Sequence, residues 1–301
     1  MKRAVSISLG SSKRDKAVEV ELLGQKISIE RIGTNGDMEK AAQLYKEMDG
    51  KVDAFGVGGA DLGLMVADKW YTLHSVKPMV RFVKQTPLVD GAGLKITLES
   101  QAASFIDAQI PAHISKHGKT AFIMTGADRW GLASSFLNSK YECTFGDLMF
   151  SLGIPMQVHT EKQLKTLANI LMPIAGRLPF KWIYPTGEKQ EERKPKHEDI
   201  FTRSTVTAGD CHYIKRYMPD KMGDKVIVTN TTTPEDVAFF RGSGCKYLIT
   251  TTPVLDGRSF GTNMMEAALV AIAGKNRPLT HDELNDYLDQ LNFKMHMQEL
   301  N

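Results

Sequence analysis

The regular alternation of short apolar strands with helical segments, from about residue 120 to the end of the chain, limits the possible folds more than any other feature. Strand patterns fall at residues 121–124, 182–184, 205–208, 226–228 and 247–249. Helical apolar spacing is found at residues 132–138, 164–175, 234–241 and 264–273. Strands that alternate with helices are typical of a parallel sheet covered on both faces. We therefore predict an α/β protein whose C-terminal part is a Rossmann-like, doubly wound parallel sheet.

The first part of the chain has a less regular pattern. Strands are predicted at residues 3–9, 18–23, 27–32 and 52–57, and helices at residues 37–48 and 60–69. Gly24 and Gln25 form a hairpin signal between two of these strands. Pro111 and Gly118 bracket a polar stretch that we take as the boundary. The prediction is two lobes: residues 1–115, with the hairpin and a glycine turn, and residues 116–301.

Composition excludes several classes of protein. The 301 residues are 42% hydrophobic and 24% charged, which is ordinary for one large or two medium globular domains. The net charge of +3, without a basic arm, predicts no nucleic-acid partner. No apolar run approaches the roughly 20 residues needed to span a membrane, and the N-terminus is too alternating for a signal peptide. We expect a cytoplasmic protein without a membrane partner; its oligomeric state stays open.

The cysteines do not suggest metal or redox chemistry. Cys143, Cys211 and Cys245 are far apart in sequence, odd in number and in no metal-binding spacing. This usage fits a reducing compartment with buried, inert thiols. Cys211 next to His212 could be a nucleophile pair, but inert thiols are the favoured interpretation. No metal centre is predicted.

Polar residues follow each strand of the second half, where ligands bind in open parallel sheets. Small residues let a ligand approach the backbone, while hydroxyls and the amides of helix N-termini bind anionic oxygens. The alternative is that these residues only cap the next helix. The recurrence after several strands favours a site for an anionic small molecule. The candidate residues are Thr125, Asp128, Arg129, Asp210, His212, Asn230, Thr231, Thr232, Thr251, Thr252, Arg258 and Asn263.

The sharpest form of this prediction concerns the two threonine-rich loops. Residues 230–233 and 250–252 follow consecutive strands, and consecutive strands are often adjacent. Arg258, in a glycine-flanked loop, would add the cation that a carboxylate or phosphate prefers. The alternative is a structural arginine that holds the loop to backbone carbonyls. The charged segment 185–197 would close over the cleft, or form a plain solvated loop.

A glycine turn follows the apolar strand at residues 52–57. Gly56, Gly58 and Gly59 occupy it, and Asp61 stands where a G-x-G-x-x-G fingerprint has its last glycine. The turn predicts a site for NAD or NADP, with these four residues as its contacts. The alternative is a short turn that brings a helix close to a strand.

Two of these motifs resemble those of a known family. Residues 55–60, Phe-Gly-Val-Gly-Gly-Ala, resemble the nucleotide loop of quinate and shikimate dehydrogenases, and residues 230–234, Asn-Thr-Thr-Thr-Pro, resemble their substrate motif. The chain is similar over most of its length to bacterial quinate 5-dehydrogenase-like proteins. Here the two motifs occur in reverse order, and Ser6 and Ser8 are a loose counterpart of that family's serine pair. The resemblance implies an NAD(P)-dependent oxidoreductase of a small hydroxylated carboxylic acid.

Such a reaction needs a group that exchanges a proton with the substrate alcohol. A lysine paired with a carboxylate is suited to this, and Lys95 with Asp90 is the best such pair by sequence. Asp128, Asp210 and Lys189 are alternatives, and two surface charges beside a glycine turn are another.

A second class of function stays open. The chain could be a non-redox binding protein or transferase, with a phosphorylated or carboxylated small molecule between two Rossmann-like lobes. The incomplete glycine fingerprint favours it, as does the lack of an acidic residue at the end of a clear next strand, where ribose recognition needs one.

Overall fold

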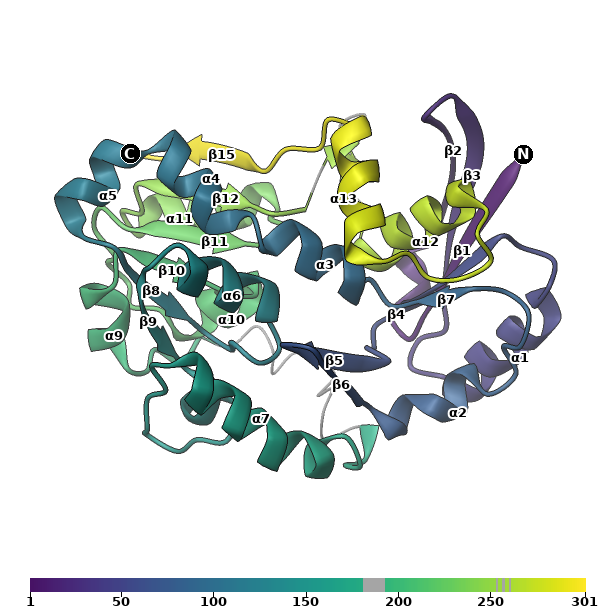
Figure 1. Ribbon diagram of the computed structural model, residues 1–301, viewed down its shortest axis with the longest axis horizontal. Coiled ribbons are helices and arrows are strands. Elements are labelled where there is room, and N and C mark those ends of the chain that lie inside the picture. The colour runs from purple at the N-terminus through teal and green to yellow at the C-terminus, as the bar shows by residue number, and fades with distance from the viewer. Residues whose placement is uncertain (181–192, 253, 256–257, 260) are drawn as a thin grey trace.

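The computed structural model describes residues 1–180, 193–252, 254–255, 258–259 and 261–301, with the backbone alone for residues 254, 255, 258 and 259. It is an α/β protein with two large sheets, shown on the two sides of Figure 1. The strand expected at residues 182–184 and most of the charged segment 185–197 lie outside the described residues. No helix in the described part of the chain is long and apolar enough to cross a membrane.

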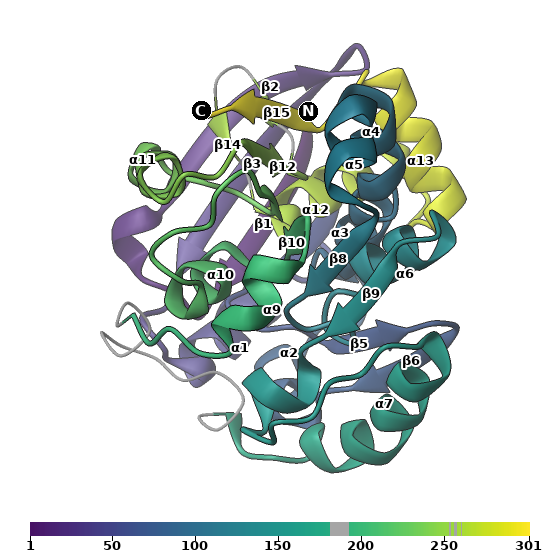
Figure 2. The ribbon, with the colours of Figure 1, turned by 90° about the vertical axis from the view of Figure 1, so that its left-hand side faces the viewer.

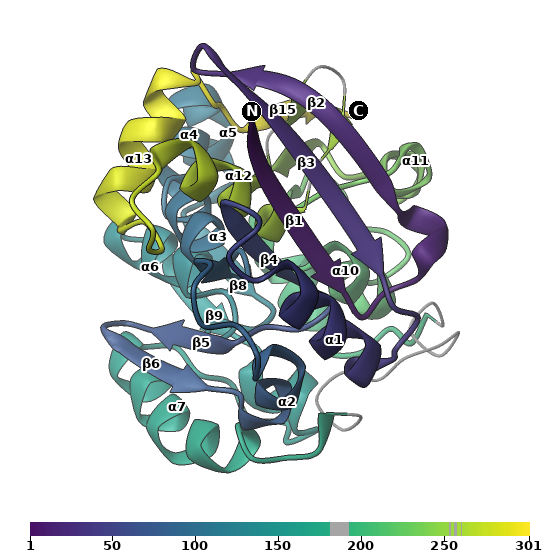
Figure 3. The same cartoon turned by 90° about the vertical axis from the view of Figure 1, so that its right-hand side faces the viewer.

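The first sheet has the strand order β2-β3-β1-β4-β7 (Figure 3). Its strands are β1 (Lys2–Ser8), β2 (Lys16–Leu22), β3 (Gln25–Gly33), β4 (Ala54–Gly58) and β7 (Leu88–Val89). Only the β2–β3 pair is antiparallel, which confirms the predicted hairpin. β1 pairs with β3 on one side and with β4 on the other, so the strand order reverses at β1.

Helices cover both faces of this sheet. Val5, Ile7, Phe55 and Val57 face α1 (Met38–Met48), η2 (His74–Val76) and α2 (Lys77–Val80). Ala4 and Ala54, on the opposite face, pack with α3 (Ala92–Glu99), α12 (Thr262–Ala273) and α13 (His281–Gln290). The division at residue 115 stays a prediction. The packing also shows a contact between the two predicted lobes. Helices from the end of the chain complete the core of the first sheet.

The second sheet has the strand order β15-β12-β11-β10-β8-β9 (Figure 1), and Figure 2 shows its β8 and β9 side by side. Its strands are β8 (Thr120–Ile123), β9 (Glu142–Phe145), β10 (Val206–Ala208), β11 (Val226–Thr229), β12 (Tyr247–Thr250) and β15 (His296–Glu299). All pairs are parallel except β12–β15. The doubly wound parallel sheet is therefore confirmed. Its order reverses at β8, which lies between β9 and β10.

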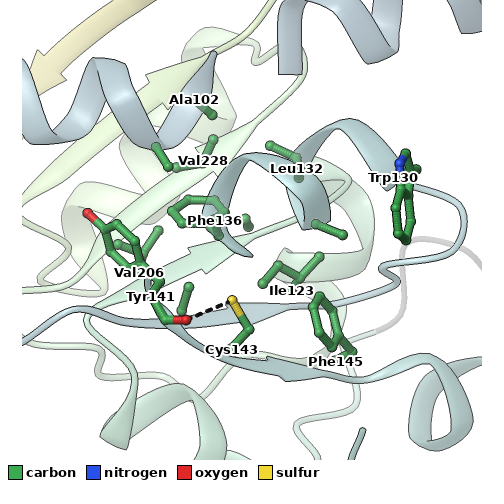
Figure 4. Packing of buried hydrophobic residues seen from close by; sticks show 14 of the residues in the cluster. Ala102, Ile123, Trp130, Leu132, Phe136, Tyr141, Cys143, Phe145, Val206 and Val228 are labelled. Carbon is green, nitrogen blue, oxygen red and sulfur yellow. Dashed lines mark hydrogen bonds between the residues drawn. The ribbon is translucent and has the colours of Figure 1, made fainter. Parts of the chain in front are cut away.

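The second sheet also has a core on each face. Figure 4 shows one of them, in which Phe136 and Leu132 pack on Ile123, Val206 and Val228. Helices α4 (Ala102–Gln109), α5 (Pro111–His117), α6 (Trp130–Asn138) and α7 (Glu161–Ala175) contribute to it. The other core is contributed by α9 (Glu198–Arg203), α10 (Cys211–Tyr217) and α11 (Pro234–Gly242).

The helix expected at residues 60–69 is wrong. Two antiparallel strands, β5 (Gly63–Val66) and β6 (Lys69–Thr72), form a hairpin there. Ala67 has a left-handed φ of 54° in its turn, and a Cβ at Gly63 would lie 2.5 Å from the Trp70 ring. The apolar residues of this segment match the helical period by chance, because cross-strand packing decides the local structure. The glycine turn after β4 therefore leads into a hairpin.

Candidate active site

The loops after β8 and β10 meet where the strand order of the second sheet reverses. Arg129, just before α6, is 5% exposed. Its guanidinium donates to Glu99 Oε1 at 2.5 Å and to Asp210 Oδ2 at 3.0 Å. Burial opposes its charge, but Glu99 and Asp210 raise the pKa of Arg129 further above its usual value. Two hydrogen-bonded carboxylates, with Asp128 Oδ2 at 3.7 Å from Nε as a third, thus already balance the charge of this arginine.

Lys95 reaches this edge from the first sheet, on α3, which runs between the two sheets (Figure 1). Its Nζ lies 3.8 Å from Asp128 Oδ1. Burial would lower the pKa of Lys95, but Asp128, with Asp61 and Glu99, raises it despite the opposing charge of Arg129. Lost hydration opposes the charge of Asp128, yet Lys95 and Arg129 hold its pKa below the usual value. The pair is therefore charged near neutral pH, and too loose for a hydrogen bond.

Asp90 has another role than the one expected as partner of Lys95. Its oxygens accept the backbone N–H of Leu62 at 2.6 Å and of Ala92 at 2.9 Å. Burial and the nearby Asp61 raise the pKa of Asp90. Asp90 therefore joins the hairpin to the start of α3, and the structure pairs Lys95 with Asp128, which the sequence offered only as an alternative.

Two acidic residues of this region escaped the sequence analysis. Glu99 is 1% exposed and lies one helical turn after Lys95, a spacing that could have marked both as one face of a helix. Asp147, directly after β9, accepts the backbone N–H of Gly126 and of Ala127, each at 2.8 Å. Burial raises the pKa of Asp147 to about 6. The amides of the loop after β8 are therefore already bound to a carboxylate of the protein.

The threonine loops lie side by side, as predicted. The Thr251 N–H donates to Thr229 O at 2.9 Å, and Thr251 and Thr252 are buried. Thr125, Thr231 and Thr232 are half-buried. The anion-binding role of these loops stays a prediction, because the Arg258 side chain lies outside the described residues.

Other expected site residues cap a helix or form hydrogen bonds within the protein. Asp210 Oδ1 accepts the His212 N–H and caps α10, and the His212 side chain is exposed. Asn230 Nδ2 donates to Asp210 Oδ2 at 3.1 Å, and its Oδ1 accepts the Cys211 N–H. Asn263, at the start of α12, lies against the first sheet instead, where its Nδ2 donates to Ser6 Oγ at 2.6 Å. The structure thus joins Asp210 and Asn230 to the Arg129 cluster and separates Asn263 from it.

The glycine turn lies at the C-terminal end of β4. Gly56 and Gly58 are buried in the strand, Gly59 follows with a left-handed φ of 71°, and Asp61 comes just before β5. Asp61 acts electrostatically on both Lys95 and Asp90. It therefore lies toward the candidate active site.

The thiols are buried, and burial raises the pKa of each to about 12. One histidine pair escaped the sequence analysis: His113 and His117 are four residues apart on α5, with ring centroids 4.5 Å apart. In the described part of the chain no group of three or more metal-ligating side chains occurs.

Comparisons with known proteins identify families and an overall likeness. Residues 93–300 match the family model described as "Domain of unknown function (DUF8754)", and residues 3–90 match "Domain of unknown function (DUF8753)". No curated protein matches. An NAD-dependent malic enzyme from Thermotoga maritima is 12% identical, over 97% of this chain and 76% of that one, with a TM-score of 0.42.

Two other solved structures have a similar likeness. Glutamate dehydrogenase from Thermus thermophilus is 12% identical over 97% of this chain and 73% of that one, with a TM-score of 0.42. GanP, a glucose-galactose binding protein from Geobacillus stearothermophilus, is 10% identical over 99% and 97%, with a TM-score of 0.36. At such identities and scores these structures carry no argument about function, so the site has to be judged by its own geometry.

Proposed function

This chain belongs to the family described as "Domain of unknown function (DUF8754)", and from the geometry of its site we propose that it is an oxidoreductase acting on a small hydroxylated carboxylic acid. The observation that supports it is the Lys95–Asp128 pair, with 3.8 Å between Nζ and Oδ1. It joins the first sheet's α3 to the edge where the second sheet reverses its strand order. Open α/β sheets bind ligands at that kind of edge.

Lys95 is the proton donor and acceptor of this proposal. Its raised pKa keeps the ammonium charged near neutral pH, so it can donate to a substrate carbonyl oxygen that gains negative charge. In the opposite direction the neutral amine, which forms only above the raised pKa of Lys95, takes the proton of the alcohol. Asp128 orients the ammonium across the 3.8 Å between Nζ and Oδ1. Arg129, Glu99 and Asp210 hold the loop that carries Asp128.

A nicotinamide cofactor, which the sequence resemblance implies, would supply the hydride of such a reaction. The glycine turn does not fit its diphosphate. The turn leads into the β5–β6 hairpin, and the backbone of Asn263 covers Gly56. Phosphate sites of this type need free amides at the start of a following helix. We therefore assign to this chain's residues only the proton transfer, with the threonine loops and Arg258 as the proposed subsite for the substrate carboxylate.

The test is turnover with a panel of keto and hydroxy acids, including quinate and shikimate, in the presence of NAD(H) or NADP(H). Nicotinamide absorbance reports the reaction. Lys95→Met should lower kcat by about 100- to 10,000-fold, the usual contribution of acid–base catalysis. Lys119→Met is the matched control, because Lys119 pairs with Asp107 at 2.6 Å and is more exposed. Full activity in Lys95→Met would remove the proposed role of Lys95.

A non-redox binding protein or transferase is the second candidate. The observation that favours it is that the protein's own residues occupy two glycine-containing loops. The backbone of Asn263 lies against Gly56, and the Asp147 carboxylate accepts the N–H of Gly126. A thermal-shift screen against carboxylated and phosphorylated small molecules distinguishes the two. A ligand at a hundred times its Kd stabilises the fold by about 2.7 kcal/mol. Stabilisation by such a ligand, with no change in nicotinamide fluorescence on mixing, would support this candidate over the first.

A further inference from the structure

The glycine turn continues a strip of small residues that runs over two neighbouring strands. In the β1–β4 register, Ala4 pairs with Ala54, Ser6 with Gly56 and Ser8 with Gly58. The alternate positions point to the opposite face and carry the large side chains of the other core. One face of this strand pair is therefore made of alanine, serine and glycine alone over these three rows.

Helix α12 occupies the space above this strip. It contacts both β1 and β4, and every residue from Met264 to Ile272 is buried. A Cβ at Gly56 would lie 2.8 Å from the backbone oxygen of Asn263. A Cβ at Gly91 would clash with the backbone nitrogen of Asn263. Glycine is therefore required at both positions because the first turn of α12 approaches their backbone.

Polar contacts hold the helix at this place. Asn263 Nδ2 donates to Ser6 Oγ at 2.6 Å, and Ser6 is 1% exposed. Further along α12, the Glu266 carboxylate accepts the N–H of Leu94 at 3.0 Å, at the start of α3. The same helix thus touches the glycine turn, Ser6 and the helix that carries Lys95.

We infer that Ser6, Gly56 and Gly58 together form the seat of α12, the surface against which the start of this helix packs, and that the glycine turn is not a dinucleotide site. The strand order of the first sheet reverses at β1, so a ligand would be expected beyond the carboxyl ends of β1 and β4, and Asn263 at the start of α12 lies against that end of both strands. The part of this inference that concerns a cofactor rests on the proposed function. A cofactor of that reaction therefore binds away from the glycine turn.

The test compares Gly56→Ala with Gly242→Ala, since an added Cβ at Gly242 has no atom within 4 Å. Thermal midpoints and calorimetric titration with NADH are measured on both variants and on the wild type. Overpacking against the α12 backbone should lower the midpoint of Gly56→Ala by roughly 2–12 °C, with little change in Gly242→Ala. Asn263→Ala, which keeps all glycines, should lose about 2–4 °C through the lost bond to Ser6 and covers the case in which Gly56→Ala does not fold.

Equal NADH affinity in the wild type and in the Gly56→Ala variant, measured at a temperature where this variant is folded, supports the inference. Absence of NADH binding in every protein also leaves it standing, if the midpoints fall as expected, and counts against the redox proposal alone. Two results would overturn it. One is an unchanged midpoint in both Gly56→Ala and Asn263→Ala. The other is a loss of NADH affinity of about tenfold or more at a temperature where Gly56→Ala is folded, a change that corresponds to 1.4 kcal/mol.

Discussion

Replacement of Arg129 by methionine removes the cation between two carboxylates at the candidate active site. The Arg129 guanidinium lies 2.5 Å from Glu99 and 3.0 Å from Asp210, and Glu99 is 1% exposed. Methionine keeps much of the apolar volume, so the main effect is an uncompensated charge on Glu99. Removal of one partner from a buried ion pair costs about 3–5 kcal/mol. For domains of this size each kcal/mol corresponds to about 2–4 °C, so we expect a fall in Tm on the order of 10 °C.

A double-mutant cycle isolates the pair from other consequences of the substitution. Glu99→Gln removes the charge that Arg129→Met leaves behind, so the double variant should recover about 2 kcal/mol or more relative to the sum of the single variants. The assay is urea unfolding followed by circular dichroism. Arg277→Met is the matched control, because Arg277 pairs with Glu283 at 2.7 Å but is 49% exposed, and it should unfold like the wild type.

One result would refute this account of Arg129. If Arg129→Met keeps the wild-type Tm but loses affinity for an anionic ligand of the cleft, Arg129 is a ligand-binding fork and Glu99 is not held by it. The cycle would then show no coupling between Arg129 and Glu99.

Two further predictions concern buried titratable groups. Burial raises the pKa of Glu266 from 4.5 to about 7, so the folded protein holds this proton more tightly than the unfolded chain does. The contribution of the protonated Glu266 to the free energy of unfolding is fully present below about pH 4.5. It is lost as the pH rises through 7, by at most about 3 kcal/mol. Thermal midpoints measured from pH 5 to 8 should therefore fall less in Glu266→Gln than in the wild type, and equal slopes would contradict the burial of a protonated Glu266. The thiols of Cys143, Cys211 and Cys245, whose pKa is raised to about 12, should not react with Ellman's reagent at pH 8 until urea is added, and fast labelling of the native protein would show that they are accessible.

Local patterns in the sequence were enough to predict most strands of the two large sheets and five of the helices that cover them, α1, α6, α7, α11 and α12. The strand β1, the β2–β3 hairpin and those strand–helix units of the second half that the structure describes are confirmed, because side-chain periodicity decides them within a few residues. Local chemistry also starts α13, where Thr280 and Glu283 form a capping box and satisfy each other's backbone N–H. The helix expected at residues 60–69 is wrong because the hairpin depends on cross-strand contacts, such as that between Gly63 and Trp70.

The sequence by itself therefore determined the α/β class and the loops on which polar residues gather. Only the tertiary structure decided which of those residues meet. Lys95 pairs with Asp128, 33 positions away, while the nearer Asp90 binds backbone amides. The glycine turn faces α12, a helix that lies about 200 residues later in the chain. The physical reason is the same in both cases: a charge pair and a close backbone approach depend on distances in space, which the spacing of residues along the chain does not contain.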